Sequence, residues 1–411
     1  MNPTKERDLA AWIIAEGLRG TAELQLLAGF CDRLVEAGIP LLRANINKRT
    51  LHPLVFGSDF EWWRDEGIRQ DDWYHGTTRP SEEELRRFPF YYMSAEGLSR
   101  LRRRLDKPVA DFPLLERLRL RGGTDYVAFG TSFGDGDTPG PFRGFSSSWT
   151  TDAPGGFNDT AISVIERSLQ PFALAVKAAS TYHAAVSVLE TYLGKDAGQR
   201  VLDGEIARGS AQTIRAVLWY ADLQGFTAIA DSTPRDQLIT MLNDYFGCMV
   251  GVVHEHGGEV LKYLGDGLLA IFRLEGQSDV CGVAVSAAES AFARVTELNS
   301  RRAKESLPVT KFYLGLHLGD VLYGNVGSDD RMDFTVIGPA VNEVSRIENM
   351  CRSLERDLIM SSAFVEAAGA CTSRIVSLGR YALRGVRQPQ ELFTLVPPES
   401  AVSPELQVIS D

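Results

Sequence analysis

The chain has 411 residues, enough for two domains that each bury a core. Its formal net charge of −11 argues against nucleic acid or an anionic membrane surface as a partner. We find no run of about 18 apolar residues and no apolar segment near the N-terminus, so we expect neither membrane insertion nor a signal peptide. Five scattered cysteines are typical of reduced thiols in a cytoplasmic protein.

The first part of the chain has a helix–strands–helix order. Apolar residues at three- and four-residue spacings predict helices over 8–37, with a break near 17–21. The elements expected next are strands at 41–47 and 51–58, an aromatic strand at 88–93, a short basic helix at 96–105, a strand at 125–132, a glycine- and proline-rich loop at 134–144 and a strand at 145–150. This order predicts an α+β domain with a central antiparallel sheet.

The same order of elements resembles a GAF domain, a small-molecule sensing module, over about residues 20–175. The likeness includes a strand, a Gly-Gly-Phe turn and a helix between Phe145 and Ile165. It implies a GAF-like sensory domain at 1–158 with a small-molecule regulator. Several aromatic side chains could line a ligand pocket or simply pack in the core, and both interpretations stay open: Trp62, Trp63, Trp73, Tyr74, Tyr91 and Tyr92. Three histidines lack ligand spacing and are expected to be structural or exposed: His52, His75 and His183.

Residues 159–193 are expected to form one long helix, followed by a connector to residue 210. Apolar residues in this helix alternate between steps of four and three, which favours a parallel coiled coil. The positions are Ala175, Ala179, Tyr182, Val186, Leu189 and Leu193. The alternative is a helix packed on its own domain. In the first case the helix could couple a sensor to a dimeric enzyme.

Two aspartates organise the second half of the chain. Asp222 follows a short β-prone run, and Asp266 lies between two glycines and between apolar runs at 260–264 and 268–272. We expect a tight hairpin there, since Asp-Gly suits positive φ. An amphipathic run at 236–254 predicts a helix after Asp222. Two carboxylates at adjacent turns suit Mg²⁺ or Mn²⁺, although each aspartate alone could be only a helix cap or a turn residue.

From about Thr213 to Val396 the chain resembles the class III nucleotidyl cyclase catalytic domain. Besides the two aspartate motifs, the likeness rests on the segment 332–346 and on Arg384-Gly385. In the first of these, Asn342 and Arg346 have the i, i+4 spacing of one helix face. The resemblance implies a catalytic domain at 211–398 with a ferredoxin-like βαββαβ core, and a C-terminal tail at 399–411.

The resemblance also implies roles for individual residues. Asp222, Asp266 and the Leu223 carbonyl would hold two Mg²⁺ or Mn²⁺ ions in each active site. The remaining roles are phosphate binding by amides near Phe226 and Thr227 and by Arg384, ribose orientation by Asn342, and stabilisation of charge on the α-phosphate by Arg346.

Two further positions match the residues that select the purine, Lys262 and Thr335. This Lys/Thr pair is the pattern of the subgroup that includes bicarbonate-responsive adenylate cyclases, whereas guanylate cyclases tend to carry Glu and Cys there. The pair therefore favours ATP over GTP. One departure is Asp320, since some members have an arginine for phosphate after this strand. His317, on the same strand, is expected to pack.

In this family the metal pair and the purine and transition-state residues lie on opposite edges of one domain. The resemblance therefore implies a homodimer with active sites at the subunit interface. We expect a cytoplasmic, sensor-regulated adenylate cyclase that makes 3′,5′-cyclic AMP and pyrophosphate from ATP. The alternatives are a guanylate cyclase and a non-catalytic nucleotide-binding regulatory module. The sequence has no Gly-Gly-Asp/Glu-Glu-Phe signature of a diguanylate cyclase.

Overall fold

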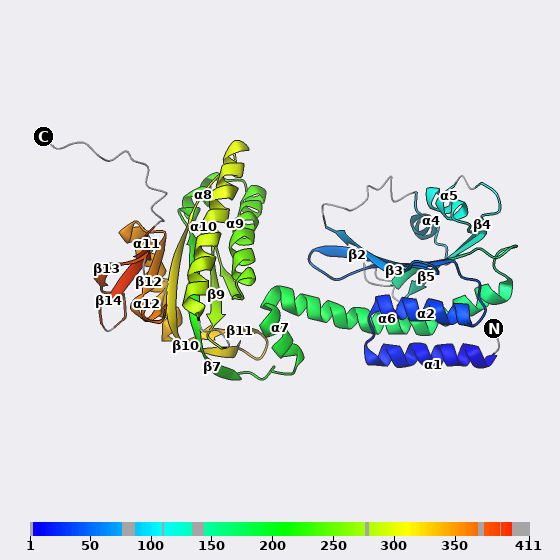
Figure 1. Ribbon diagram of the computed structural model, residues 1–411, viewed down its shortest axis with the longest axis horizontal. Helices are drawn as coiled ribbons and strands as arrows, with labels where there is room; N and C mark the ends of the chain where they lie inside the picture. Colours follow the sequence, from blue (N-terminus) through cyan, green and yellow to red (C-terminus); the bar gives the residue numbers. More distant parts are fainter. Residues whose placement is uncertain are drawn as a thin grey trace. The chain divides into compact units, whose positions relative to one another are not determined.

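The computed structural model describes residues 3–75, 87–108, 111–133, 144–275, 279–368, 374–386 and 388–396. The chain divides into two compact units, Met1–Thr191 and Tyr192–Asp411, each with its own sheet (Figure 1). Residues 134–143 of the expected loop, Cys371 and the C-terminal tail lie outside the described residues. No disulfide joins any two of the other four cysteines, all of which are described.

The first unit contains a six-stranded sheet in the order β3-β2-β1-β6-β5-β4, with antiparallel neighbours throughout. Its strands are β1 Arg43–Arg49, β2 Val55–Trp63, β3 Gly67–Tyr74, β4 Arg100–Arg104, β5 Asp125–Ser132 and β6 Gly144–Thr151. Its helices are α1 Pro3–Arg19, α2 Glu23–Glu36, α4 Pro89–Ala95, α5 Pro113–Leu120 and α6 Asp159–Leu193. The central antiparallel sheet and the paired N-terminal helices were expected from the sequence.

Both faces of this sheet are covered, because side chains alternate along each strand. Val127 and Phe129 of β5 pack into a core with α1, α2 and α6. Tyr126 and Ala128 point the other way, into a second core with α4 and α5. Figure 1 shows the two groups of helices on opposite sides of the sheet.

Two sequence-based predictions in this unit are wrong. Residues 88–93 were expected to be a strand but lie mostly in α4, which has Pro89 at its N-terminus and buries Pro89 and Met93, one turn apart. Residues 96–105 were expected to be a basic helix but contain the edge strand β4, paired with β5. Its arginines meet acidic partners there: Arg102 donates to the fully buried Asp125 at 2.7 Å.

The long helix α6 spans Asp159–Leu193 as expected. The first two positions of the proposed seam, however, are buried in the unit's own core: Ala175 and Ala179 are 3% and 1% exposed. Ala175 lies against Gly17 of α1, because a Cβ added to Gly17 would be only 2.9 Å from the Ala175 Cβ. A continuous coiled coil from Ala175 is therefore wrong, and the first half of α6 packs on its own domain. Beyond it, Tyr182 is 56% exposed.

Among the described helices, α6 is the one whose length and composition would allow it to cross a membrane. A core helix of a soluble protein passes the same test, and residues Ala161–Ala179 of α6 contribute to a core. The absence of membrane insertion stays a prediction.

The second unit contains a larger sheet in the order β13-β14-β12-β10-β7-β9-β8, with β11 paired to β10. Its strands are β7 Ala211–Leu223, β8 Glu259–Leu264, β9 Gly267–Arg273, β10 Phe312–Gly327, β11 Met332–Ile337, β12 Leu358–Ser361, β13 Ile375–Tyr381 and β14 Gln390–Leu395. Its helices are α7 Lys195–Leu202, α8 Phe226–Ser232, α9 Arg235–Glu255, α10 Val280–Lys304, α11 Pro339–Leu354 and α12 Ser362–Ala367.

The central strand β7 separates two cores. Val217 and Trp219 face α9 and α10, whereas Ala216 and Leu218 pack with residues of α7 and α11. By the same alternation Asp222, at the end of β7, lies on the α11 side. This assignment places the end of β7 and α11 on one side of the sheet.

α7 is tied to this sheet through Asp196. Its carboxylate accepts hydrogen bonds from Arg273 of β9, from Tyr323 of β10 at 2.9 Å and from Arg200 one turn further along α7 at 2.9 Å. Arg273 also lies over the Tyr323 ring, 4.7 Å from its centroid. The segment that follows α6 is therefore fixed to the two strands that flank β7.

Candidate active site

The two aspartates come from neighbouring strands. Asp222 pairs with Gly267 across β7 and β9, so Asp266, one residue earlier, lies in the turn beside the end of β7. The turn is a two-residue hairpin, Gly265-Asp266, as Leu264 pairs with Gly267. The positive φ, +69°, belongs to Gly265 and not to Gly267. The expected hairpin is present, but its positive-φ glycine precedes the aspartate.

The backbone holds Asp222 closely against this hairpin. A Cβ on Gly267 would lie 2.9 Å from Asp222 Oδ1 and 2.7 Å from the Ala221 carbonyl oxygen. Burial raises the pKa of Asp222 to about 6, and the Asp266 carboxyl next to it contributes. Two adjacent carboxylates that repel each other form a donor set that fits a divalent cation with oxygen ligands. No cluster of three or more acidic, histidine or cysteine ligands occurs among the described residues.

A third carboxyl group, Glu348 of α11, belongs to the same electrostatic environment. Burial raises its pKa to about 7, and repulsion from Asp222 and Asp266 adds to the effect. Glu348 packs where α11 approaches β10, with its Cβ 3.0 Å from the position of a Cβ on Gly315. The sequence analysis missed Glu348, although this residue lies only two positions beyond Arg346, the last residue of the motif.

α11 also carries Asn342 and Arg346, as expected from their spacing. Asn342 is exposed and Arg346 is half-buried. Among the described residues, no hydrogen bond or ion pair joins either side chain to Asp222 or Asp266. The Arg346 guanidinium lies instead beside Gly385, where a Cβ would come within 3.3 Å of Nη2. The fold thus brings together two motifs almost 40 positions apart in the chain, and the neighbouring Arg384 is exposed.

The two base-selecting candidates lie on β8 and β11, which contact each other. Lys262 Nζ donates to Asp333 Oδ2 at 2.6 Å. Thr335, two positions after Asp333 on β11, is 6% exposed, and its Oγ1 has no hydrogen-bond partner among the described residues. The sequence analysis missed Asp333. The available signal was its position two residues before Thr335, which puts both side chains on the same face of the strand.

The candidate phosphate-binding turn follows β7. Gly225, with φ of +65°, precedes α8, and Ala228 is the first residue whose N–H donates to the Gly225 carbonyl. The amides of Phe226 and Thr227 come before it, at the start of the helix. Leu223 is buried at the end of β7, next to Asp222.

His317 packs as expected. It is buried on β10, with Nδ1 2.9 Å from Ser361 Oγ, and burial lowers its pKa to about 4. Asp320 follows on the same strand and is paired with Arg215 of β7 in the sheet register. Arg215 lies on β7, so it does not occupy the position at which some class III members carry their arginine.

Comparisons with known proteins show what the second unit is similar to. Residues 210–397 match the model of the adenylate and guanylate cyclase catalytic domain. An adenylate cyclase of Anabaena cylindrica is 32% identical over 158 residues, which are 38% of this chain and 31% of that protein. An uncharacterized protein of Mycobacterium tuberculosis (strain CDC 1551 / Oshkosh) is 33% identical over 178 residues, 43% of this chain and 31% of that protein.

The matches therefore span about a third of the length of these curated relatives. Among solved structures, the crystal structure of a guanylyl cyclase aligns with a TM-score of 0.41 and 27% identity, over 47% of this chain and 98% of that one.

Proposed function

We propose that this protein is an adenylate cyclase, in which residues 210–397, an adenylate or guanylate cyclase catalytic domain, convert ATP to 3′,5′-cyclic AMP and pyrophosphate. In this reaction the ribose 3′-oxygen bonds to the α-phosphorus, the bond from that phosphorus to the bridging oxygen breaks, and the hydroxyl proton is released. The observation that carries the proposal is the Asp222–Asp266 pair at adjacent strand ends.

The charge of this pair supports metal binding. Asp222 and Asp266, with the Leu223 carbonyl, would hold two Mg²⁺ or Mn²⁺ ions. Bound ions of this kind lower the pKa of an attacking hydroxyl and neutralise a departing pyrophosphate. Burial and the neighbouring Asp266 carboxyl raise the pKa of Asp222, and a bound divalent cation would act against both effects.

The residues of α11 would act on the α-phosphate. Asn342 would orient the ribose, and Arg346 would stabilise the negative charge that builds on the α-phosphate oxygens. The closeness of Arg346 to Gly385 supports a shared phosphate-binding surface with Arg384. An arginine side chain can bind two phosphate oxygens at once.

Selection of ATP is assigned to Lys262 and Thr335. The Thr335 hydroxyl is buried and has no partner among the described residues, so it can accept a hydrogen bond from the adenine amino group. Asp333 holds the Lys262 ammonium near β11, where it can donate to a purine ring nitrogen. GTP is the competing substrate.

The active sites are proposed to form between two copies of the chain. Within one chain, the described residues contain no hydrogen bond or ion pair that joins Asn342 or Arg346 to Asp222 or Asp266, which supports sites completed by the partner. Mixing two inactive variants, Asp222→Ala and Arg346→Ala, would then restore one intact site in each heterodimer. Subunit exchange without any return of activity would contradict the shared site.

Regulation is assigned to the first unit as a GAF-like sensor. A cavity of about 760 Å³ lies between β1, β2 and β3 and the helices α4 and α5. Trp63, Trp73 and Tyr91 line it, whereas Trp62 packs in the opposite core. Of the six aromatics considered from the sequence, some therefore fit the ligand-pocket interpretation and at least one is core. The length of α6 and the attachment of α7 to the catalytic sheet support coupling through this helix.

The first test is product analysis. We would incubate the purified chain with Mn²⁺ and either ATP or GTP and separate the products, with Asp222→Ala as the matched inactive control. Cyclic AMP from ATP alone supports the proposal. Cyclic GMP from GTP alone would show that Lys262 and Thr335 select guanine, and no product from either the full chain or residues 204–411 would favour a non-catalytic nucleotide-binding module.

A further inference from the structure

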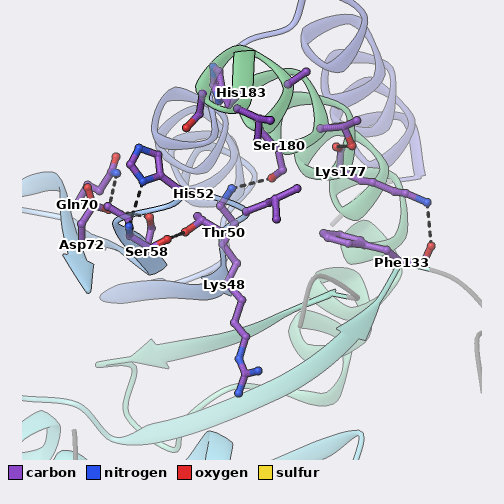
Figure 2. Close-up of a pocket in the computed structure, with 18 of the residues that line it drawn as sticks. Lys48, Thr50, His52, Ser58, Gln70, Asp72, Phe133, Lys177, Ser180 and His183 are labelled. Carbon is purple, nitrogen blue, oxygen red and sulfur yellow. Dashed lines mark hydrogen bonds between the residues drawn. The ribbon is translucent and has the colours of Figure 1, made fainter. Parts of the chain in front are cut away.

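A second cavity of the first unit lies against the coupling helix. It has a volume of about 770 Å³, within the range of about 300–1,000 Å³ typical of small-molecule sites. Its walls are the end of β1 with the segment that follows it, parts of β2 and β3, and residues 177–189 of α6. Figure 2 shows Lys177, Ser180 and His183 on α6, with Lys48, Thr50 and His52 across the cavity.

The body of this cavity is apolar. α6 contributes Ala184, Ala185, Val188 and Leu189, and Phe133 contributes an aromatic ring. These α6 residues lie beyond Ala179, the last position of α6 that is buried in the core of the unit. An apolar ligand surface could therefore lie directly against the second half of α6.

The polar rim carries two exposed cations and one carboxylate. Lys177 and Arg49 are exposed cations. His52 Nδ1 accepts hydrogen bonds from the amides of Leu54 and Val55, each at 3.0 Å, so its neutral ring carries the proton on Nε2. The one carboxylate of the lining, Asp72, already accepts hydrogen bonds at Oδ1 from Ser58 and Gln70 at 2.7 and 2.9 Å.

One wall contains a cluster of hydrogen-bonded polar side chains around the buried Lys48–Glu23 pair. Lys48 of β1 forms an ion pair with Glu23 of α2 and donates to Ser180 of α6 at 2.7 Å. His183, one turn further along α6, lies 2.9 Å from the second Glu23 oxygen. Glu23 neutralises Lys48, whereas Arg49 and Lys177 form no ion pair within the part of the chain that the structure describes. The cluster fixes α6 to both β1 and α2 beside the cavity.

A buried hydroxyl in the lining also lacks a partner. Ser187 Oγ, on the α6 wall, has no hydrogen-bond partner among the described residues. A buried polar atom in this state is destabilising unless a ligand or water satisfies it. The cavity thus combines an apolar body, a cationic rim and an unsatisfied hydroxyl.

We propose that this cavity binds a small amphipathic monoanion, an alkyl or aryl carboxylate. Its apolar body lies against Ala184, Ala185 and Val188, and Lys177 binds its carboxylate. Lys177 Nζ donates to the Phe133 carbonyl at 3.0 Å, and with respect to the described residues this leaves two of its three N–H donors for the ligand. Because the ligand touches α6 itself, its binding biases the helix that leads to the catalytic domain. This regulatory consequence rests on the proposed function, whereas the binding site does not.

The test uses three probes that share one alkyl chain and differ in the head group: decanoate, decanol and decylammonium, each below its micelle concentration. Isothermal titration of the full chain should show saturable binding of decanoate at one site per chain. Decanol should bind about tenfold more weakly, because the charge-assisted hydrogen bond is lost, and decylammonium weaker still. Equal binding of all three would overturn the proposal.

Variants locate the site. Ala185→Trp fills the cavity from an exposed helix position and should abolish decanoate binding, whereas Ala178→Trp, exposed on α6 but outside the lining, should not. Lys177→Gln should weaken decanoate about tenfold and leave decanol unchanged. Circular dichroism confirms that each variant folds. Decanoate binding that survives Ala185→Trp would place the ligand elsewhere and refute the site.

The regulatory part of the proposal is tested separately, through the rate of cyclic AMP formation. With ATP and Mn²⁺, decanoate should change the cyclase rate of the wild type and of Ala178→Trp but not of Ala185→Trp. Binding without any rate change in an active enzyme would refute the coupling alone. If the protein lacks cyclase activity, titration still tests the site, so the two failures are distinguishable.

Discussion

The Arg346 guanidinium lies against Gly385, so close that a Cβ on this glycine would come within 3.3 Å of Nη2. Gly385 also has a φ of +73°, which favours glycine. A side chain at this position would therefore displace the proposed transition-state arginine and strain the backbone at the same time.

We expect Gly385→Val to lower kcat by about 100-fold, in the range seen when a charge-stabilising donor is lost. Gly379→Val is the matched control, because its φ is +100° but nothing lies within 4 Å of its Cβ position. Both variants should lose about 1–3 kcal/mol of stability from the backbone change. Steady-state kinetics and thermal melting separate the two effects, and an equal loss of kcat in both variants would contradict the role of the Arg346 contact.

Asp222→Asn should stabilise the metal-free protein while abolishing turnover. Because burial and Asp266 raise its pKa to about 6, the folded state binds more protons than the unfolded state between about pH 4 and 6. Stability contributed by protonated Asp222 is lost as the pH rises through this window. The variant should therefore gain about 1 kcal/mol above pH ~6, after a discount for partial exposure, and nothing near pH ~4.

Thermal melting in EDTA measures this gain. Mn²⁺ should raise the melting temperature of the wild type and have a much smaller effect on Asp222→Asn, because binding to the folded state alone stabilises it. A lower melting temperature for the variant at neutral pH would show that the two carboxylates do not repel each other in solution.

Substrate choice should depend on three residues rather than two. Lys262→Glu with Thr335→Cys introduces the guanylate cyclase pattern, but the new carboxylate would face Asp333, which now binds Lys262 at 2.6 Å. Adding Asp333→Asn removes this repulsion. We expect the triple variant to favour GTP by at least about tenfold and the double variant to be less active, since unpaired buried polar groups reject the wrong base.

Product chromatography with ATP and GTP in competition measures the ratio. Asp333→Asn alone serves as the control and should keep ATP as its substrate. Retention of ATP preference by the triple variant would remove Lys262 and Thr335 from the specificity site.

His317 should make the second unit less stable in mild acid. Burial lowers its pKa to about 4, although the Glu343 carboxylate, 3.5 Å from Nε2, acts in the opposite direction from a partly exposed position. Between about pH 6.5 and 4 the unfolded state therefore binds a proton that the folded state does not, and stability falls as the pH drops. The loss is at most about 3 kcal/mol.

His317→Gln, whose amide can either donate to or accept from the Ser361 hydroxyl, should flatten this dependence. Thermal melting of both proteins at about pH 7.5, 6 and 5 provides the measurement. A variant with the same slope as the wild type would assign the acid sensitivity to other groups.

The sequence was sufficient for features that depend on local chemistry. The hairpin at Asp266, the helix after Asp222 and the full extent of α6 follow from turn residues, periodicity and glycine stops over short stretches, although the positive φ lies at Gly265 and not at Gly267. The motifs also identified Asp222, Asp266, Asn342 and Arg346 as candidates, because their spacing within each motif is itself the signal. Their roles stay predictions.

The tertiary structure decided the features that depend on contacts between residues far apart in the sequence. Residues 100–104 form a strand because β5 offers paired hydrogen bonds and a buried Asp125, although the basic run resembles a helix. Ala175 and Ala179 fit a coiled-coil seam in sequence, but both are buried in the core of the first unit, where the absence of a side chain at Gly17 lets α1 pack on Ala175. Likewise, the Lys262–Asp333 pair and the Arg346–Gly385 approach join residues about 70 and 40 positions apart. Periodicity carries no information on such contacts, because they arise only when separate elements pack.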